Sequence, residues 1–180
     1  MQLSDARDIM VEPAVVWAAI LDPAVLMLCV PGCESMSGSV DAGFEAVVVQ
    51  KIGPVSARFT GMVTFSDIVP GQGLQITGEG KGGAAGFAKG GAKVTLHAIE
   101  GGTRLEYEVE ARVGGKIAQL GSRLIDSFAK KMADEFFARF QRHIEGPAPV
   151  DEEMAAESGD TEMPEDEGQE KKGWFRRIIG

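Results

Sequence analysis

The chain has 180 residues, of which 44% are hydrophobic and 25% are charged, a composition typical of a globular protein. Its net charge of −9 argues against a nucleic-acid-binding protein, which needs a basic face, and two cysteines are too few for a disulfide-rich scaffold. The first ten residues include Asp5, Arg7 and Asp8, which the apolar region of a signal peptide does not tolerate, so we expect a cytoplasmic protein.

The first part of the chain predicts one strand followed by two short helices. Residues 2–11 favour the strand. Glu12-Pro13 then starts a helix, because proline suits the first helical position and an acidic side chain suits the positive end of the helix dipole. Asp22-Pro23 starts the second helix, which we expect to end before Pro31-Gly32.

After the helices the hydrophobic pattern changes to a period of two, which is typical of strands. Strands are expected at residues 44–52, 55–66, 94–98 and 105–113, and another begins with Leu74 and Ile76. Turns are expected at Gly53-Pro54 and at Glu100–Thr103. In the last of the strands, apolar and charged residues alternate strictly. This alternation indicates an antiparallel sheet with one buried face.

A long helix follows Gly114-Gly115 and is expected to run to about His143, because its apolar residues recur every three or four positions. It is the only large partner against which the sheet can bury its apolar face. The fold class is therefore α+β, with a curved antiparallel sheet wrapped around one long C-terminal helix.

The run Gly78–Gly83 matches the dinucleotide-binding pattern G-x-G-x-x-G. That chemistry needs a helix N-terminus directly afterwards, whereas residues 84–93 lead into another strand, so we reject the match. We interpret residues 78–91 as a flexible loop between strands. Phe87 at its centre either closes over the mouth of a cavity or has no role.

Cys29 and Cys33 do not predict a metal site, which needs about four ligands. The histidines, His97 and His143, lie far along the chain, at a solvent-facing strand position and beside the tail. We interpret the cysteines as ordinary buried or half-buried thiols. A redox pair is the alternative, but it has no nearby base.

No catalytic pair of side chains is evident either. The row Glu106, Glu108 and Glu110 shares its face with Arg104 and Arg112, which indicates a charged, exposed surface. Tyr107 faces inward, where its hydroxyl needs a partner, either a ligand carbonyl or a group of the protein core. We therefore expect no enzyme activity.

The end of the chain differs from its body in charge. Residues 1–142 carry a net charge of −2, residues 143–170 carry −11 and residues 171–180 carry +4. The acidic part is poor in large apolar residues and is expected to be disordered. We therefore expect a domain over 1–145, an acidic linker over 146–170 and a cationic amphipathic segment over 171–180.

That final segment is expected to bind an anionic membrane surface, weakly and reversibly, because its apolar and basic side chains fall on opposite sides of a helix. The expected membrane-binding residues are Lys171, Lys172, Trp174, Phe175, Arg176, Arg177, Ile178 and Ile179. A solvated tail and a peptide that docks on a partner protein are the alternatives.

Several motifs together resemble the START-like, or polyketide-cyclase-like, superfamily of helix-grip proteins: E-P-A-V-V-W-A-A-I-L-D-P at 12–23 and P-G-C-E at 31–34. Within it, K-I-G-P-V at 51–55, G-F-A-K-G-G-A-K-V at 86–94 and the acidic spacer with its cationic end are similar to the G-subunit family of carbon monoxide dehydrogenase. The resemblance covers residues 1 to about 145.

This resemblance implies an apolar cavity between sheet and helix. It also implies an accessory role beside a molybdenum hydroxylase of the carbon monoxide dehydrogenase type, which such proteins bring to the cytoplasmic membrane or connect with the quinone pool. Relatives of that enzyme act on other substrates, so the substrate stays open. No covalent cofactor and no metal are implied.

The combined prediction is a non-catalytic domain that holds a hydrophobic ligand, an isoprenoid quinone in its most concrete form, on the inner face of the cytoplasmic membrane. Large residues on expected inward faces are the candidate cavity residues: Phe59, Phe65, Leu74, Ile76, Phe87, Leu96, Tyr107, Leu120, Leu124 and Phe128. Two alternatives remain, a small cyclase or hydrolase and a structural membrane adaptor with a filled core.

Overall fold

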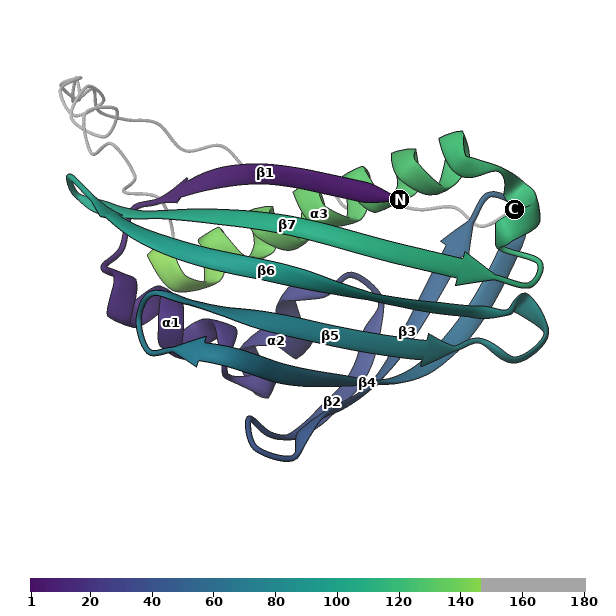
Figure 1. Ribbon diagram of the computed structural model, residues 1–180, viewed down its shortest axis with the longest axis horizontal. Coiled ribbons are helices and arrows are strands. Elements are labelled where there is room, and N and C mark those ends of the chain that lie inside the picture. The colour runs from purple at the N-terminus through teal and green to yellow at the C-terminus, as the bar shows by residue number, and fades with distance from the viewer. Residues whose placement is uncertain (147–180) are drawn as a thin grey trace, which may run out of the picture. The chain divides into compact units, whose positions relative to one another are not determined.

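The computed structural model describes residues 1–146 and consists of one antiparallel sheet with a long helix across one of its faces (Figure 1). The strands are β1 (Gln2–Ile9), β2 (Cys33–Ser39), β3 (Gly43–Ile52), β4 (Val55–Val69), β5 (Gly73–Lys81), β6 (Phe87–Ile99) and β7 (Gly102–Gly114), in the spatial order β1-β7-β6-β5-β4-β3-β2. The helices are α1 (Pro13–Ile20), α2 (Pro23–Cys29) and α3 (Ser122–Glu145), with short 3-10 turns η1 (Gly83–Ala85) and η2 (Ala118–Leu120). This architecture confirms the predicted helix-grip fold. The predicted acidic linker and segment 171–180 lie outside the described residues.

Both short helices begin and end as the sequence predicts. Each has its proline at the start, and the Asp22 carboxylate caps α2 by accepting a hydrogen bond of 2.8 Å from the Ala24 amide. The second helix ends at Cys29, ahead of Pro31. These two helices connect β1 to the rest of the sheet.

Strand β2 has no counterpart among the predicted strands. Its sequence, CESMSGS, has almost no apolar residues, so the period-two signal is missing. It forms because it lies at the edge of the sheet and needs only one partner, β3.

The interpretation of residues 78–91 as a loop is wrong for most of the run. Strand β5 continues to Lys81, and β6 begins at Phe87, so only residues 82–86 connect the two strands. Within the hairpin, Gly78 lies opposite Gly90 and Gly80 lies opposite Ala88. The glycines therefore belong to the sheet.

The long helix begins later than predicted, at Ser122. The preceding Gly121 has a φ of +86°, which glycine adopts without strain, and there the chain changes direction before the helix starts. With 24 residues, α3 is about 36 Å long. It ends at Glu145, close to the predicted end.

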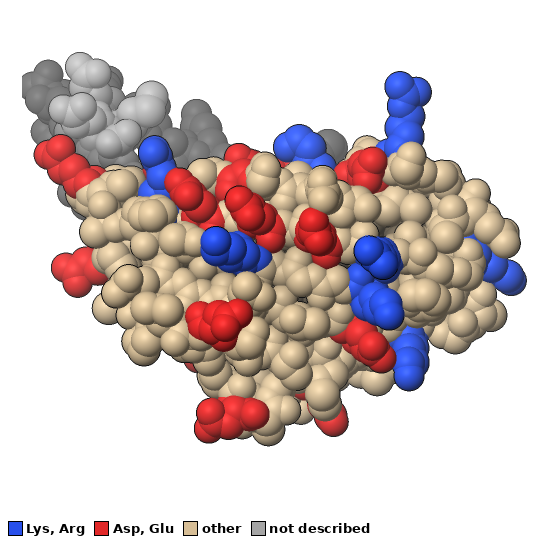
Figure 2. Space-filling view, viewed as in Figure 1, with Lys and Arg blue, Asp and Glu red and all other residues tan. Residues whose placement is uncertain are grey.

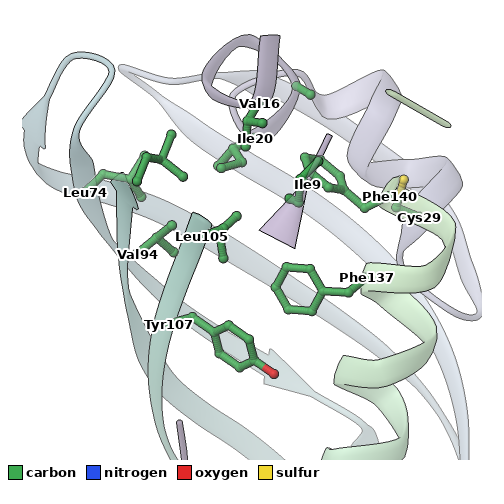
Figure 3. Packing of buried hydrophobic residues seen from close by; sticks show 12 residues of the cluster. Ile9, Val16, Ile20, Cys29, Leu74, Val94, Leu105, Tyr107, Phe137 and Phe140 are labelled. Atoms are coloured by element: carbon green, nitrogen blue, oxygen red, sulfur yellow. The ribbon is translucent and has the colours of Figure 1, made fainter. Parts of the chain in front are cut away.

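Two separate hydrophobic clusters lie between the sheet and α3. The main core joins α1, α2 and the C-terminal half of α3 to one end of the sheet (Figure 3). Its buried members are Ile9, Val16, Ala19, Ile20, Cys29, Leu74, Val94, Leu96, Leu105, Tyr107, Phe137 and Phe140. The second cluster, which we call the loop-end cluster, is built on Ile52, Ala85 and Ile117 at the other end of the sheet. The two clusters have no residue in common.

Candidate functional site: an apolar hollow in the inner face of the sheet

The inner face of the sheet contains an open, apolar hollow of about 360 Å³, which we call the inner hollow. Strands β3 to β7 all contribute to its wall. The wall residues whose side chains or Cα atoms face inward are Ala46, Val48, Phe59, Gly61, Val63, Ile76, Gly78, Gly80, Ala88, Gly90, Ala92, Val109 and Ala111. Nearly all are glycine, alanine or valine, so the middle of this face carries little side-chain volume.

The small residues are aligned across the strands by the register of the sheet. One row runs Ala46, Gly61, Gly80 and Ala88 from β3 to β6. The next row runs Val63, Gly78, Gly90 and Ala111 from β4 to β7. Two adjacent rows of small residues remove the bulk that would otherwise fill the centre of the fold.

These glycines are of two kinds. A Cβ atom on Gly61 would lie 2.5 Å from the Glu79 carbonyl oxygen, and one on Gly90 would lie 2.2 Å from the Glu110 carbonyl oxygen, so close strand packing requires glycine there. A Cβ atom on Gly78 or Gly80 would come no nearer than 3.7 Å to a neighbouring atom, an ordinary contact. Neither has a positive φ, so no backbone constraint explains glycine at 78 and 80. What their lack of a side chain provides is space in the inner hollow.

Helix α3 spans the distance between the two clusters. Phe128 packs against the loop-end cluster and Phe136, two turns later, packs against the main core. Met132 lies midway on the same helix face, is partly buried and belongs to neither cluster. Its flexible side chain is the type that adapts to variable apolar surroundings.

One polar group stands where the main core approaches the inner hollow. The Tyr107 ring is buried and stacks on Phe137 with a centroid distance of 4.8 Å, and its hydroxyl is directed toward α3 (Figure 3). Burial raises the pKa of the Tyr107 phenol, and the neighbouring Arg7 guanidinium opposes that rise. Arg7 in turn is held by Asp134 of α3 at 2.5 Å and Asp5 of β1 at 3.0 Å.

The ionisable wall residues do not face the inner hollow. Glu79, Lys89 and Glu110 contribute backbone to the wall, but their side chains alternate to the outer face of the sheet and are exposed. The inner face is thus apolar, and its chemistry is that of a binding surface for hydrophobic groups.

The structure distributes the ten predicted cavity residues over several places. Phe59 and Ile76 line the inner hollow. Five others lie nearer the clusters than the hollow: Leu74, Leu96 and Tyr107 are in the main core, and Leu120 and Phe128 pack on the loop-end cluster. Phe65 packs against the main core and edge-on to Phe44 at 4.9 Å.

The prediction of inward-facing side chains is wrong for Phe87 and Leu124, which are 44% and 38% exposed. Phe87 is the first residue of β6, in which the even-numbered positions point inward, and it lies over Gly114 on the outer face. Leu124 lies in the first turn of α3, next to Gly53 of the β3–β4 turn.

Sequence reasoning missed the small residues that shape the hollow, because it searched for large inward-facing side chains. The signal was present: in β5 the even positions Leu74, Ile76, Gly78 and Gly80 continue one alternation with polar odd positions. Glycines that continue the apolar phase of a strand mark an inward face without side chains.

The remaining candidates show no reactive arrangement in residues 1–146. Cys29 is buried and Cys33 half-buried, both are free, and burial raises the pKa of each thiol. His97 is exposed and lies 3.5 Å from Glu106 on the outer face. Over the same residues, no cluster of His, Cys, Asp or Glu is arranged to hold a metal ion.

A curved antiparallel sheet wrapped around a long C-terminal helix defines the helix-grip class. Within this class, the family model of the carbon monoxide dehydrogenase G subunit (CoxG) matches residues 6–145, and the chain belongs to this family. None of the curated proteins compared with the chain matches it.

Solved structures share the fold. A conserved protein from Geobacillus kaustophilus is 27% identical, with a TM-score of 0.75, covering 81% of this chain and 95% of its own. An uncharacterised protein from Rhizobium leguminosarum is 17% identical, with a TM-score of 0.61 and coverage of 81% and 94%. Protein CV1439 from Chromobacterium violaceum is 16% identical, with a TM-score of 0.58 and coverage of 81% and 98%. In the part of the chain that the structure describes, no helix is both long and apolar enough to cross a bilayer.

Proposed function

We propose that this protein is a non-catalytic accessory protein of a molybdenum hydroxylase of the carbon monoxide dehydrogenase type, and that it binds a lipid-soluble quinone in the inner hollow. In this role it links the enzyme to the cytoplasmic membrane. The observation that carries the proposal is the pair of small-residue rows, above all Gly78 and Gly80, which leave about 360 Å³ of apolar space where the backbone does not require glycine.

The size and lining of the hollow suit part of an isoprenoid quinone. Ligand pockets commonly measure about 300–1,000 Å³, so this one is at the small end of the range. It is large enough for a ring and the first part of an isoprenoid tail, with the remainder of the tail extending beyond it. The polar group that we assign to a quinone carbonyl is the Tyr107 hydroxyl, which lies beside Arg7 and two residues before the wall residue Val109 on β7.

Family membership supports the choice of partner enzyme, because the family is that of the G subunit of carbon monoxide dehydrogenase. The cationic amphipathic segment, Lys171–Gly180, supports the membrane link through its sequence alone. Together they favour a ligand carrier that acts between a cytoplasmic oxidation and a membrane.

The two alternatives have less support. A structural adaptor gains nothing from glycine at positions 78 and 80, each of which weakens its strand. A cyclase or hydrolase needs a reactive pair of side chains beside its substrate, and the ionisable wall residues point to the opposite face of the sheet.

The test is to fill the hollow without changing the backbone. Gly78→Leu and Gly80→Leu each place a large side chain in the hollow, whereas Thr77→Leu places the same side chain on the outer face of β5. Binding of a short-tailed benzoquinone is measured by equilibrium dialysis of the full chain. We expect the Gly78→Leu and Gly80→Leu variants to bind at least about tenfold more weakly, and Thr77→Leu to bind like the wild type.

In ¹⁵N-labelled protein, the quinone should also shift the amide signals of Gly78, Gly80 and Gly90 ahead of those on the outer face. Equal binding by all variants would place the ligand elsewhere. No binding by the wild type would leave an adaptor as the function.

A further inference from the structure

Three connections meet at the end of the sheet that the loop-end cluster occupies, and we call them together the loop end. Taken with the two residues that flank them on each side, they are the β3–β4 turn (residues 51–56), the β5–β6 connection (80–88) and the β7–α3 connection (113–123). The Ile117 amide donates a hydrogen bond of 3.1 Å to the Ala85 carbonyl, which ties the last two together. Ile52, Ala85 and Ile117, one from each connection, pack in the same cluster.

The loop end is purely cationic. Its charged side chains are Lys51, Lys81, Lys116 and Arg123, with no Asp or Glu among them, and Lys89 and Arg112 lie just beyond it on β6 and β7. With the same flanking residues, all other connections of residues 1–146 together carry Asp8, Glu12, Asp22, Glu34, Asp41 and Glu100, and no Lys or Arg. On the face drawn in Figure 2, Lys and Arg accordingly gather toward the right-hand end, and Asp and Glu predominate over the rest. The domain is therefore polarised along its strands.

These cations are poorly neutralised within the described residues. Lys89 of β6 lies directly opposite Arg112 of β7, an arrangement of like charges that destabilises a sheet, and on its other side directly opposite Glu79 of β5. Glu79 therefore serves two cations, since its carboxylate also lies 3.9 Å from the Lys81 Nζ atom. In residues 1–146, Lys51, Lys116 and Arg123 form no ion pair. An external anionic surface would relieve this repulsion.

Exposed apolar side chains stand among the cations. Phe87 lies between Lys81 and Lys89 in sequence and is 44% exposed, and Leu124 follows Arg123 and is 38% exposed. An aromatic ring and a leucine surrounded by Lys and Arg match the boundary between lipid headgroups and acyl chains. A soluble acidic peptide would neutralise the charges but would leave these two side chains in water.

The loop end also covers one side of the inner hollow. Phe59 lines the hollow and packs on the loop-end cluster, and a Cβ atom on Gly82 would lie 2.6 Å from the Phe59 ring. The β5–β6 connection thus rests directly on a wall residue. A ligand that leaves the hollow past Phe59 emerges at the cationic, partly apolar end.

From these observations we propose that the loop end docks on an anionic lipid bilayer and that the apolar ligand passes between bilayer and hollow through this end. The docking surface is distinct from segment 171–180. The passage of a ligand rests on the proposed function, whereas docking itself rests on charge and exposed apolar side chains.

The experiment measures binding of the full chain to vesicles of phosphatidylcholine with and without phosphatidylglycerol. Lys51→Glu/Lys116→Glu reverses two exposed loop-end charges, and the control Lys93→Glu/Lys131→Glu makes the same change at exposed cations elsewhere. A second variant, Leu124→Ser, tests the apolar contact without a change of charge. We expect the loop-end double variant to bind anionic vesicles at least about tenfold more weakly than the control, and Leu124→Ser to bind severalfold more weakly than the wild type.

Equal vesicle binding by the loop-end and control variants would overturn the proposal and leave segment 171–180 as the sole membrane contact. A further variant carries the loop-end changes and lacks residues 151–170. If it binds vesicles like the wild type, the proposal is also overturned, because the acidic segment would then be the occupant of the loop end. Quinone dialysis of the same loop-end variant without vesicles separates the two proposals. If the variant keeps its quinone affinity but loses vesicle binding, the result supports docking at the loop end. If it keeps both, only the docking proposal is refuted and the proposed quinone site stands.

Discussion

Single glycines decide whether the centre of this domain is filled or open. Gly78 and Gly80 sit in the interior of β5 with ordinary φ values and room for a Cβ atom, and yet they are glycine. A glycine in a strand interior costs about 0.5–1 kcal/mol relative to alanine. Loss of stability in exchange for open space is typical of binding sites.

We predict that Gly78→Ala raises the free energy of unfolding by about 0.5–1 kcal/mol and at the same time weakens quinone binding. Gly61→Ala, in contrast, should lower stability, because its Cβ atom would lie 2.5 Å from the Glu79 carbonyl oxygen. Urea unfolding of the two variants beside the wild type checks both signs. If Gly78→Ala proved destabilising, position 78 would require glycine for the backbone and the argument for an open hollow would weaken.

At the scale of elements, an ion pair joins the edge strand β1 to β7. Arg104 donates two hydrogen bonds, of 2.7 and 2.8 Å, to the Asp8 carboxylate directly opposite, and this pairing lowers the pKa of Asp8 below its ordinary value. A lowered pKa in the folded state contributes stability above the unfolded pKa, which is near 4. That stability is lost as the pH falls through the lower, folded value.

Asp8→Asn should therefore lower the free energy of unfolding at pH 7, and the difference from the wild type should shrink as the pH falls below about 4. Urea unfolding at a series of pH values measures this convergence. A difference that stays constant with pH would mean that the carboxylate charge does not contribute.

Helix α3 packs its C-terminal half on the main core and its N-terminal turns on the loop-end cluster. Phe140 is fully buried in the main core, whereas Met132 belongs to neither cluster. We predict that Phe140→Ala lowers the free energy of unfolding by about 3–5 kcal/mol and that Met132→Ala lowers it by less than about 2 kcal/mol. Similar large losses for both, measured by urea unfolding, would indicate that α3 packs tightly over the middle of the sheet.

The element order could be predicted because its signals are local. The prolines of α1 and α2, the alternation in β4 and β7 and the spacing in α3 are read from neighbouring residues. Strand β2 could not be predicted, because its pairing with β3 gives its polar sequence a structure that local preference does not.

The site was only half predictable for a related reason. A hollow is a property of several strands in register, and only pairing reveals that Gly61, Gly80 and Ala88 are neighbours. Residues chosen for their size, such as Leu74 and Leu96, belong instead to the main core that closes one end. The charge of the loop end was likewise hidden, since its three segments are far apart along the chain.

At the scale of the whole molecule, the described domain has an order along its strands: a main core, an apolar hollow, a small cluster and a cationic end. This order places the space for a ligand next to the surface proposed to meet lipid. It gives a physical route by which a small protein takes up a water-insoluble compound without exposing it fully to water.

The surface charge leads to a prediction for the whole chain. Because the proposed contact with lipid is largely electrostatic, binding to anionic vesicles should fall steeply as salt rises from about 0.05 M to about 0.5 M, while quinone binding in solution should change little. Vesicle sedimentation and dialysis over the same salt series compare the two. A parallel fall of both would mean that the ligand site itself depends on the surface charges.

The central claim is that the inner hollow holds a lipid-soluble quinone, and native mass spectrometry with organic extraction of the protein from its own host tests it most directly. We predict close to one quinone per wild-type chain, retained in Thr77→Leu and lost in Gly78→Leu. An empty wild-type protein, or a Gly78→Leu protein that retains the quinone, would contradict the claim.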